Sequence, residues 1–236
     1  MDGPDFLGIG AQKAGTSWLH ANLAQHPRVR FPGGKELHFW NRDRPRGLDF
    51  YRAQFAGAER GVLQGDITPA YATLSVEQIA EIAQEFPRLR IFFLLRHPVE
   101  RAWSSARMAL KRAELEPDEA SDAWYLDHFR SRGSRARGDY AACLERWLAS
   151  FSREVVLLLR YEDLETRPED VARAACAHLG LDAAPLLRPE NPWLRQRVFE
   201  GERAELRPAL RAALTELYAE PLQRLRDQQG VSWEAS

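Results

Sequence analysis

The chain has 236 residues, 44% of them hydrophobic, and a formal net charge of −1. This length and apolar content are sufficient for one well-packed domain, and the balanced charge argues against nucleic acid as a partner. The sequence contains no apolar run of about 18 residues and no signal-peptide pattern, so we expect a cytoplasmic protein without a membrane partner.

Four segments are apolar runs of strand length, a pattern typical of strands buried on both faces of a parallel sheet. They are residues 6–11, 62–68, 90–96 and 154–164. Helical patterns lie between and after them. We therefore expect an α/β fold whose parallel sheet is covered by helices on both faces. The helical patterns are Leu19 with Leu23, Val99 to Leu110, Tyr140 to Phe151 with Trp147 facing inward, and Leu206 to Leu225 with a kink at Pro221.

The stretch from Ala113 to Arg137 has few apolar residues and changes sign along its length, with acidic residues first and arginines after them. A solvated surface excursion is the simplest interpretation of this pattern. A lid over a ligand, or an acceptor-binding segment, is the alternative.

The two cysteines, Cys143 and Cys176, each lie within a helical pattern. Lone cysteines in such positions are typically free and buried, and we expect that here. No group of histidine, cysteine and carboxylate residues has metal-ligand spacing, so we expect no metal site.

The stretch "GIGAQKAGTSWL" follows the first expected strand. A strand, a glycine turn and a helix start together form an anion site, because free N–H groups and the helix dipole face the ligand. Gly10 and Gly15 have the spacing of a P-loop, but Lys13 lies between them rather than at the end of the loop. A Mg²⁺-dependent kinase needs the lysine at that end. The order of residues therefore favours metal-free transfer of an anionic group.

Lysine is scarce in this chain, since only three of the 33 lysine and arginine residues are lysines. Positions that keep a lysine are candidates for a compact ammonium group that arginine cannot replace. Two of the three, Lys13 and Lys35, lie in the glycine loop and in the segment "GGKELHFWN".

Several motifs together carry a resemblance to a known family. "QKAGTSWL", "RHPVERAWSS" and "GDYAACLERWL…VVLLLRYEDL" resemble sulfotransferases that use 3′-phosphoadenosine 5′-phosphosulfate (PAPS). With "KELHFW", they are most similar to the heparan-sulfate-type (N-/3-O-sulfotransferase-like) branch and its bacterial relatives. The similarity extends from about Phe6 to Leu181. It implies a single sulfotransferase domain over residues 1–236, with a parallel sheet of about four or five strands and P-loop-like topology.

The resemblance also implies nucleotide-binding residues. The 3′-phosphate is assigned to Arg96 and Ser104, and a guanidinium at the end of a strand suits a phosphate dianion. Arg137 and Tyr140 match a further element near the nucleotide. Arg195, Arg197 and Arg203 are candidates for a late basic loop, with no choice among them. The 5′-phosphosulfate is assigned to Lys13, Ala14, Gly15, Thr16, Ser17 and Trp18.

The segment "GGKELHFWN" offers a general base for an acceptor hydroxyl or amine, because a carboxylate or imidazole near the sulfur can take the proton. The resemblance favours Glu36 as the base, with His38 as second choice and Lys35 beside them. An exposed Lys–Glu pair beside core aromatics is the non-catalytic alternative. Lys13 would stabilise charge on the oxygen that leaves sulfur, without a metal.

The acceptor side departs from the family, because Ile67 in "GDITPAY" stands where a lysine is common. Either that role is absent or Lys35 covers it, and Asp66 becomes a candidate for acceptor binding or backup base. We expect a small-molecule or carbohydrate acceptor. A non-catalytic nucleotide-binding protein on the same fold, or a P-loop kinase, are the alternatives. Two acceptor sites are open: an aromatic pocket lined by Trp40, Trp124, Tyr125 and Phe129, or an acidic sugar held by the arginines from 130 to 137.

Overall fold

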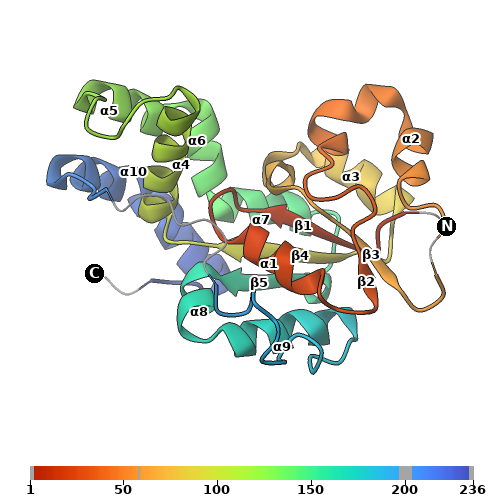
Figure 1. Cartoon of the computed structure of the whole chain (residues 1–236). Helices are drawn as coiled ribbons and strands as arrows, with labels where there is room; N and C mark the ends of the chain where they lie inside the picture. Colours follow the sequence, from red (N-terminus) through yellow and green to blue (C-terminus); the bar gives the residue numbers. More distant parts are fainter. Residues whose placement is uncertain (1–2, 58, 197–203, 234–236) are drawn as a thin grey trace. The chain divides into compact units, whose positions relative to one another are not determined.

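The computed structural model describes residues 3–57, 59–196 and 204–233 (Figure 1). Its centre is a parallel sheet of five strands in the order β2-β3-β1-β4-β5. The expected α/β class and parallel sheet are therefore confirmed. The strands are β1 (Phe6–Gly10), β2 (Val29–Arg30), β3 (Leu63–Ile67), β4 (Arg90–Leu95) and β5 (Val156–Arg160).

Two strands differ from the expectation. β2 was not expected, because two residues are too short to leave an apolar pattern. The run expected at 154–164 ends at Arg160, and helix α8 (Tyr161–Thr166) follows directly. Glu162 and Asp163 lie in the first turn of α8, where negative charge stabilises a helix start.

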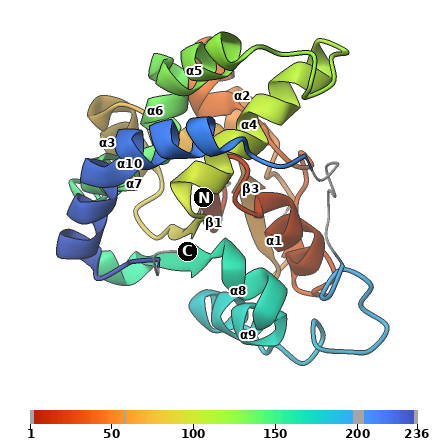
Figure 2. The ribbon, with the colours of Figure 1, turned by 90° about the vertical axis from the view of Figure 1, so that its left-hand side faces the viewer.

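The described residues form two compact units, one within Met1–Leu95 and Arg146–Phe199 and one within Arg96–Glu145 and Glu200–Ser236. The first unit contains the whole sheet. In both views α8 and α9 lie beside β5 (Figures 1 and 2). The helices that lie entirely in this unit are α1 (Thr16–Leu23), α2 (Leu48–Ala53), α3 (Val76–Glu85), α8 (Tyr161–Thr166) and α9 (Pro168–Leu179).

Packing around the sheet follows from its apolar strands. Five of the six residues of β4 are buried, and Phe92 packs edge-on against His178 of α9 with ring centroids 5.0 Å apart. Helix α7 (Tyr140–Leu148) contributes residues to both units. As expected, its Trp147 is fully buried, and the indole N–H donates to the Tyr71 carbonyl at 3.2 Å.

The second unit is helical in its described part. The stretch expected as a surface excursion, 113–137, contains α5 and most of α6. Tyr125 and Phe129 are buried there, because they lie four residues apart on the inner face of α5. Helix α10 continues through Pro221 without interruption. The helices of this unit are α4 (Pro98–Arg112), α5 (Asp122–Arg130), α6 (Arg132–Gly138) and α10 (Pro208–Gln229).

Both cysteines are buried and free, as expected, with Cys143 in α7 and Cys176 in α9. Within the described ranges, no helix combines the length and the apolar content needed to cross a membrane.

The contact between β1 and β3 leaves no room for a side chain at Gly65. A Cβ there would lie 2.1 Å from Cζ of Phe6. We expect Gly65→Ala to lower the free energy of unfolding by about 1–3 kcal/mol through overpacking. Phe6→Leu in the same chain should recover part of that loss, which chemical denaturation of the two single variants and the double variant would measure. Wild-type stability of Gly65→Ala would contradict this packing.

Candidate active site

The glycine loop follows β1 at the point where the order of the sheet changes direction. β3 pairs with one side of β1 and β4 with the other, so the chain crosses over β1 between them. Ligands of open α/β sheets bind at the carboxyl ends of the strands at such a switch point. The Ala11 N–H donates to the Leu94 carbonyl at 2.7 Å and fixes the loop to β4.

Glycine is required at the end of the loop. Gly15 has φ 92° and is the N-cap of α1, and a Cβ on it would lie 2.3 Å from Cδ1 of Leu164. Lys13 also has a left-handed backbone, with φ 69°. Gly15 thus allows the loop to approach α8 closely. The first N–H groups of α1 follow directly, and helix starts of this kind hold phosphate groups.

The six residues assigned to this loop divide by burial. Lys13, Gly15 and Ser17 are partly exposed, whereas Ala14, Thr16 and Trp18 are buried. The indole N–H of Trp18 donates to the Leu194 carbonyl at 3.1 Å, so this ring is held in the interior. Trp18 thus supports α1 from within.

The segment with the expected base lies at the end of the neighbouring strand. The Glu36 N–H donates to the Ile67 carbonyl at 3.1 Å, and Ile67 is paired with Gly8 of β1. Parallel pairing therefore brings the glycine loop and Glu36 to the same edge of the sheet. Lys13 and Glu36 are 23 positions apart in the sequence but belong to adjacent strand ends.

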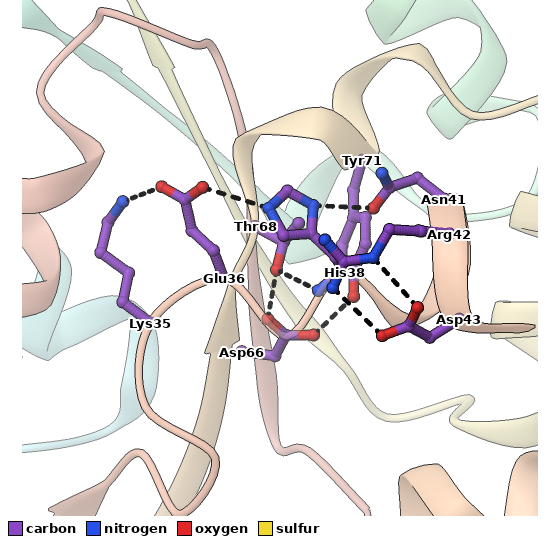
Figure 3. A network of polar contacts seen from close by, with 9 residues as sticks. All are labelled: Lys35, Glu36, His38, Asn41, Arg42, Asp43, Asp66, Thr68 and Tyr71. Carbon is purple, nitrogen blue, oxygen red and sulfur yellow. Dashed lines mark hydrogen bonds and ion pairs between the residues drawn. The ribbon is translucent and has the colours of Figure 1, made fainter. Parts of the chain in front are cut away.

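Glu36 is held between two basic side chains (Figure 3). The Lys35 ammonium contacts Oε1 of Glu36, and Nε2 of His38 lies 3.3 Å from Oε2. Nδ1 of His38 lies 3.2 Å from Oδ1 of Asn41. The side chain of Glu36 is 37% exposed. The structure thus brings together the three residues expected to carry proton transfer and leaves the carboxylate accessible.

Asp66 and Trp40 were expected to contact an acceptor, and the structure places both in the interior. Asp66 is fully buried, and its oxygens accept from the hydroxyls of Thr68, Tyr51 and Tyr71 at 2.7, 3.0 and 2.8 Å. Burial raises the pKa of Asp66, and the hydrogen bonds from these hydroxyls oppose that shift. Trp40 packs edge-on against Tyr51 with ring centroids 5.6 Å apart. Such burial corrects the acceptor-binding role expected for both residues.

The residues expected at the 3′-phosphate lie in the second unit. Arg96 directly follows β4, and Ser104 lies in α4, largely buried. The Tyr140 hydroxyl donates to the Arg96 carbonyl at 2.8 Å, and burial raises the pKa of Tyr140. Tyr140 therefore fixes the backbone at Arg96.

Arg137 and Arg107 add positive charge in the same unit. Arg137 donates to the Gly133 carbonyl at 2.9 Å, and burial, followed by the charge of Arg101, lowers its pKa. Burial and then the charge of Arg96 lower the pKa of Arg107. Arg107 was not among the expected residues, although its position one turn after Ser104 on α4 was a usable signal.

Of the late arginines, Arg195 is mostly exposed and pairs with Glu169. Arg197 and Arg203 lie outside the described residues.

An anion loop at a switch point, with a carboxylate held at the adjacent strand end, defines a group-transfer enzyme of the α/β class. Comparison with known sequences identifies the family. The profile of the sulfotransferase domain matches residues 3–204. The chain belongs to the sulfotransferase domain family.

Individual relatives agree with this membership. The mouse heparan sulfate glucosamine 3-O-sulfotransferase 3B1 is 31% identical over 185 residues, which are 75% of this chain and 46% of that protein. The chain thus spans about half or less of the length of the curated relatives it matches. The crystal structure of a sulfotransferase from Alicyclobacillus acidocaldarius superimposes with a TM-score of 0.75 at 28% identity, covering 98% of this chain and 97% of that one.

A more distant structure shares the fold. Mouse sulfotransferase SULT7A1, solved in complex with PAP, has a TM-score of 0.61 at 16% identity, covering 96% of this chain and 85% of that one. These neighbours confirm the sulfotransferase fold that the sequence motifs predicted.

The pKa of His20 on α1 depends on the position of Lys35. Burial, followed by the charge of Lys35, lowers the pKa of His20 from its ordinary 6.5. We expect Lys35→Gln to raise the pKa of His20, measured by NMR titration of its imidazole. An unchanged titration midpoint would mean that Lys35 does not face α1.

The same shift has a consequence for stability. Because the pKa of His20 is lower in the folded protein, the unfolded chain binds more protons as the pH falls below about 6.5. The stability that neutral His20 contributes is therefore complete above this pH and is lost as the pH falls through the lowered pKa. His20→Gln should reduce the stability lost between about pH 7 and pH 5.

Proposed function

We propose that this chain transfers a sulfuryl group from PAPS to a hydroxyl of a small-molecule or carbohydrate acceptor, with an amine as the second choice of acceptor group. The observation that carries the proposal is the Glu36 carboxylate held between Lys35 and His38 on a sulfotransferase domain. A relative is named as a heparan sulfate glucosamine 3-O-sulfotransferase, which supports a carbohydrate hydroxyl as the acceptor group. The PAP complex of SULT7A1 supports a nucleotide donor of this kind.

In the proposed reaction the acceptor oxygen attacks sulfur in line with the bond to the 5′-phosphate. The S–O bond to the bridging oxygen breaks as the new one forms, and the acceptor proton passes to the carboxylate of Glu36. Lys13 and the first N–H groups of α1 stabilise the charge that develops on the bridging oxygen. His38 orients the carboxylate and is the second candidate for the base.

The nucleotide assignments rest on the sequence motifs and on local geometry in each unit. The 5′-phosphosulfate is assigned to the loop from Lys13 to Ser17, whose left-handed turns at Lys13 and Gly15 shape a phosphate cradle. The 3′-phosphate is assigned to Arg96 and Ser104. No metal takes part in the proposed step, because the charge is stabilised by protein groups.

The donor can be tested by thermal shift. 3′-Phosphoadenosine 5′-phosphate at about 100 times its dissociation constant should stabilise the folded protein by about 2.7 kcal/mol. ATP with Mg²⁺ should have no comparable effect. Lys13→Ala should weaken the shift, and Lys111→Ala, which changes another of the three lysines, should leave it intact. Stabilisation by ATP with Mg²⁺ and not by the bisphosphate would favour a kinase.

The base can be tested by transfer from ³⁵S-labelled PAPS to N-sulfated heparan sulfate and to 4-nitrophenol. We expect Glu36→Gln to reduce kcat by about 10² or more, the usual range for loss of a general base, with nucleotide affinity unchanged. The exposed Glu59→Gln serves as the matched control. A severe loss in His38→Ala beside a mild one in Glu36→Gln would assign the base to His38. Tight binding of the bisphosphate without any sulfuryl transfer would favour a non-catalytic nucleotide-binding protein.

A further inference from the structure

The segment that carries the base is docked through its backbone onto the end of β3. We call Glu36–His38 the base segment and Asp66–Thr68 the anchor. Two N–H groups of the base segment donate to residues of the anchor. These bonds are Glu36 N to Ile67 O at 3.1 Å and His38 N to Thr68 Oγ1 at 3.4 Å. The backbone of Leu37, between them, opposes the rise that burial causes in the pKa of Asp66.

The base segment needs this support because its backbone is strained. Glu36 and His38 both have left-handed conformations, with φ 66° and 56°, which cost a non-glycine residue about 1–3 kcal/mol each. The N–H groups of Glu36 and His38 have separate acceptors, the Ile67 carbonyl and the Thr68 hydroxyl, so the left-handed turn is held at two points.

The anchor holds a buried carboxyl group that packing alone would not require. Asp66 is fully buried, and in the described part of the chain no salt bridge to it is found. A buried carboxylate is costly unless its oxygens are hydrogen-bonded, and apolar residues of similar size are often equally stable. Its hydrogen-bond donors are hydroxyls, and Figure 3 shows two of them, Thr68 and Tyr71, pointing toward Asp66. The arrangement fixes the geometry of the base segment at a cost in stability.

That geometry determines which side chains meet. Glu36 and His38 are two residues apart, and with both backbones held their side chains project together, so that Nε2 of His38 lies 3.3 Å from Oε2 of Glu36. The Thr68 hydroxyl donates to Asp66 at 2.7 Å and accepts from the backbone N–H of His38 at 3.4 Å. Asp66 is thus linked to the backbone of His38 through Thr68.

We propose that Asp66 and Thr68 are positioning residues that hold the backbone of the base segment so that Glu36 and His38 meet. Neither contacts the reacting atoms. The catalytic meaning of this role rests on the proposed function, whereas the geometric claim concerns the folded protein alone and is measurable without an acceptor.

The test compares Asp66→Asn, Thr68→Val and Thr68→Ser in the full chain. Valine keeps the shape of threonine but removes the hydroxyl, and serine retains the hydroxyl. Thr73→Val is the matched control, because the Thr73 hydroxyl donates at 3.1 Å to the Ala70 carbonyl in the adjacent 3₁₀ helix (Pro69–Thr73). The primary readout is the imidazole resonance of His38 by NMR, assigned with His38→Gln.

We expect Asp66→Asn and Thr68→Val to move the His38 resonance, while Thr68→Ser and Thr73→Val resemble the wild type. In the transfer assay, the first two variants should lose about 10- to 100-fold in kcat, with KM for PAPS within about twofold, because a displaced base affects the chemical step. Calorimetric affinity for 3′-phosphoadenosine 5′-phosphate should be unchanged.

An unchanged His38 signal in folded Thr68→Val would overturn the proposal, as would failure of serine to restore the wild-type signal. If Asp66→Asn does not fold, Thr68→Val and Thr68→Ser decide the question. If the wild-type protein neither binds the bisphosphate nor transfers a sulfuryl group, the proposed function is refuted. The NMR comparison then still tests the positioning role by itself.

Discussion

The site depends on the parallel pairing of β1 with β3. Register places Gly8 opposite Ile67, so the loop that leaves β1 and the segment bound to Ile67 emerge at one edge of the sheet. A slip of one residue would turn Asp66 to the opposite face and remove the carboxylate from Leu37. Gly65 permits this pairing, because Phe6 fills the space that a side chain would need. Close packing inside the sheet thus determines the chemistry at its edge.

Much of the fold could be predicted from the sequence because buried parallel strands leave continuous apolar runs. β1, β3 and β4 follow such runs closely, whereas β2 has two residues and leaves no pattern. The end of β5 was placed too late, since the apolar run gives way to a helix start at Tyr161. The helices within 113–137 were not expected, because charged residues dominate that stretch and Tyr125 and Phe129 are its large buried side chains.

The candidate site was predictable where the chemistry is local. Lys35, Glu36 and His38 are near neighbours in sequence, and the structure brings their side chains into contact. The interior position of Asp66 was not predictable, because it depends on hydroxyls from Tyr51 and Tyr71 on separate elements. A carboxylate at a strand end has the same sequence signature whether it faces a ligand or a set of buried hydroxyls. Only tertiary packing distinguishes the two.

The neutral surroundings of Asp66 have a consequence for the response to ionic strength. Mobile ions screen partly exposed charges such as the Lys35–Glu36 pair, and they weaken the attraction of a basic loop for an anionic nucleotide. Hydrogen bonds from buried hydroxyls to Asp66 are screened far less. Added electrolyte therefore acts on the capture of the donor, while the backbone beneath Glu36 keeps its conformation.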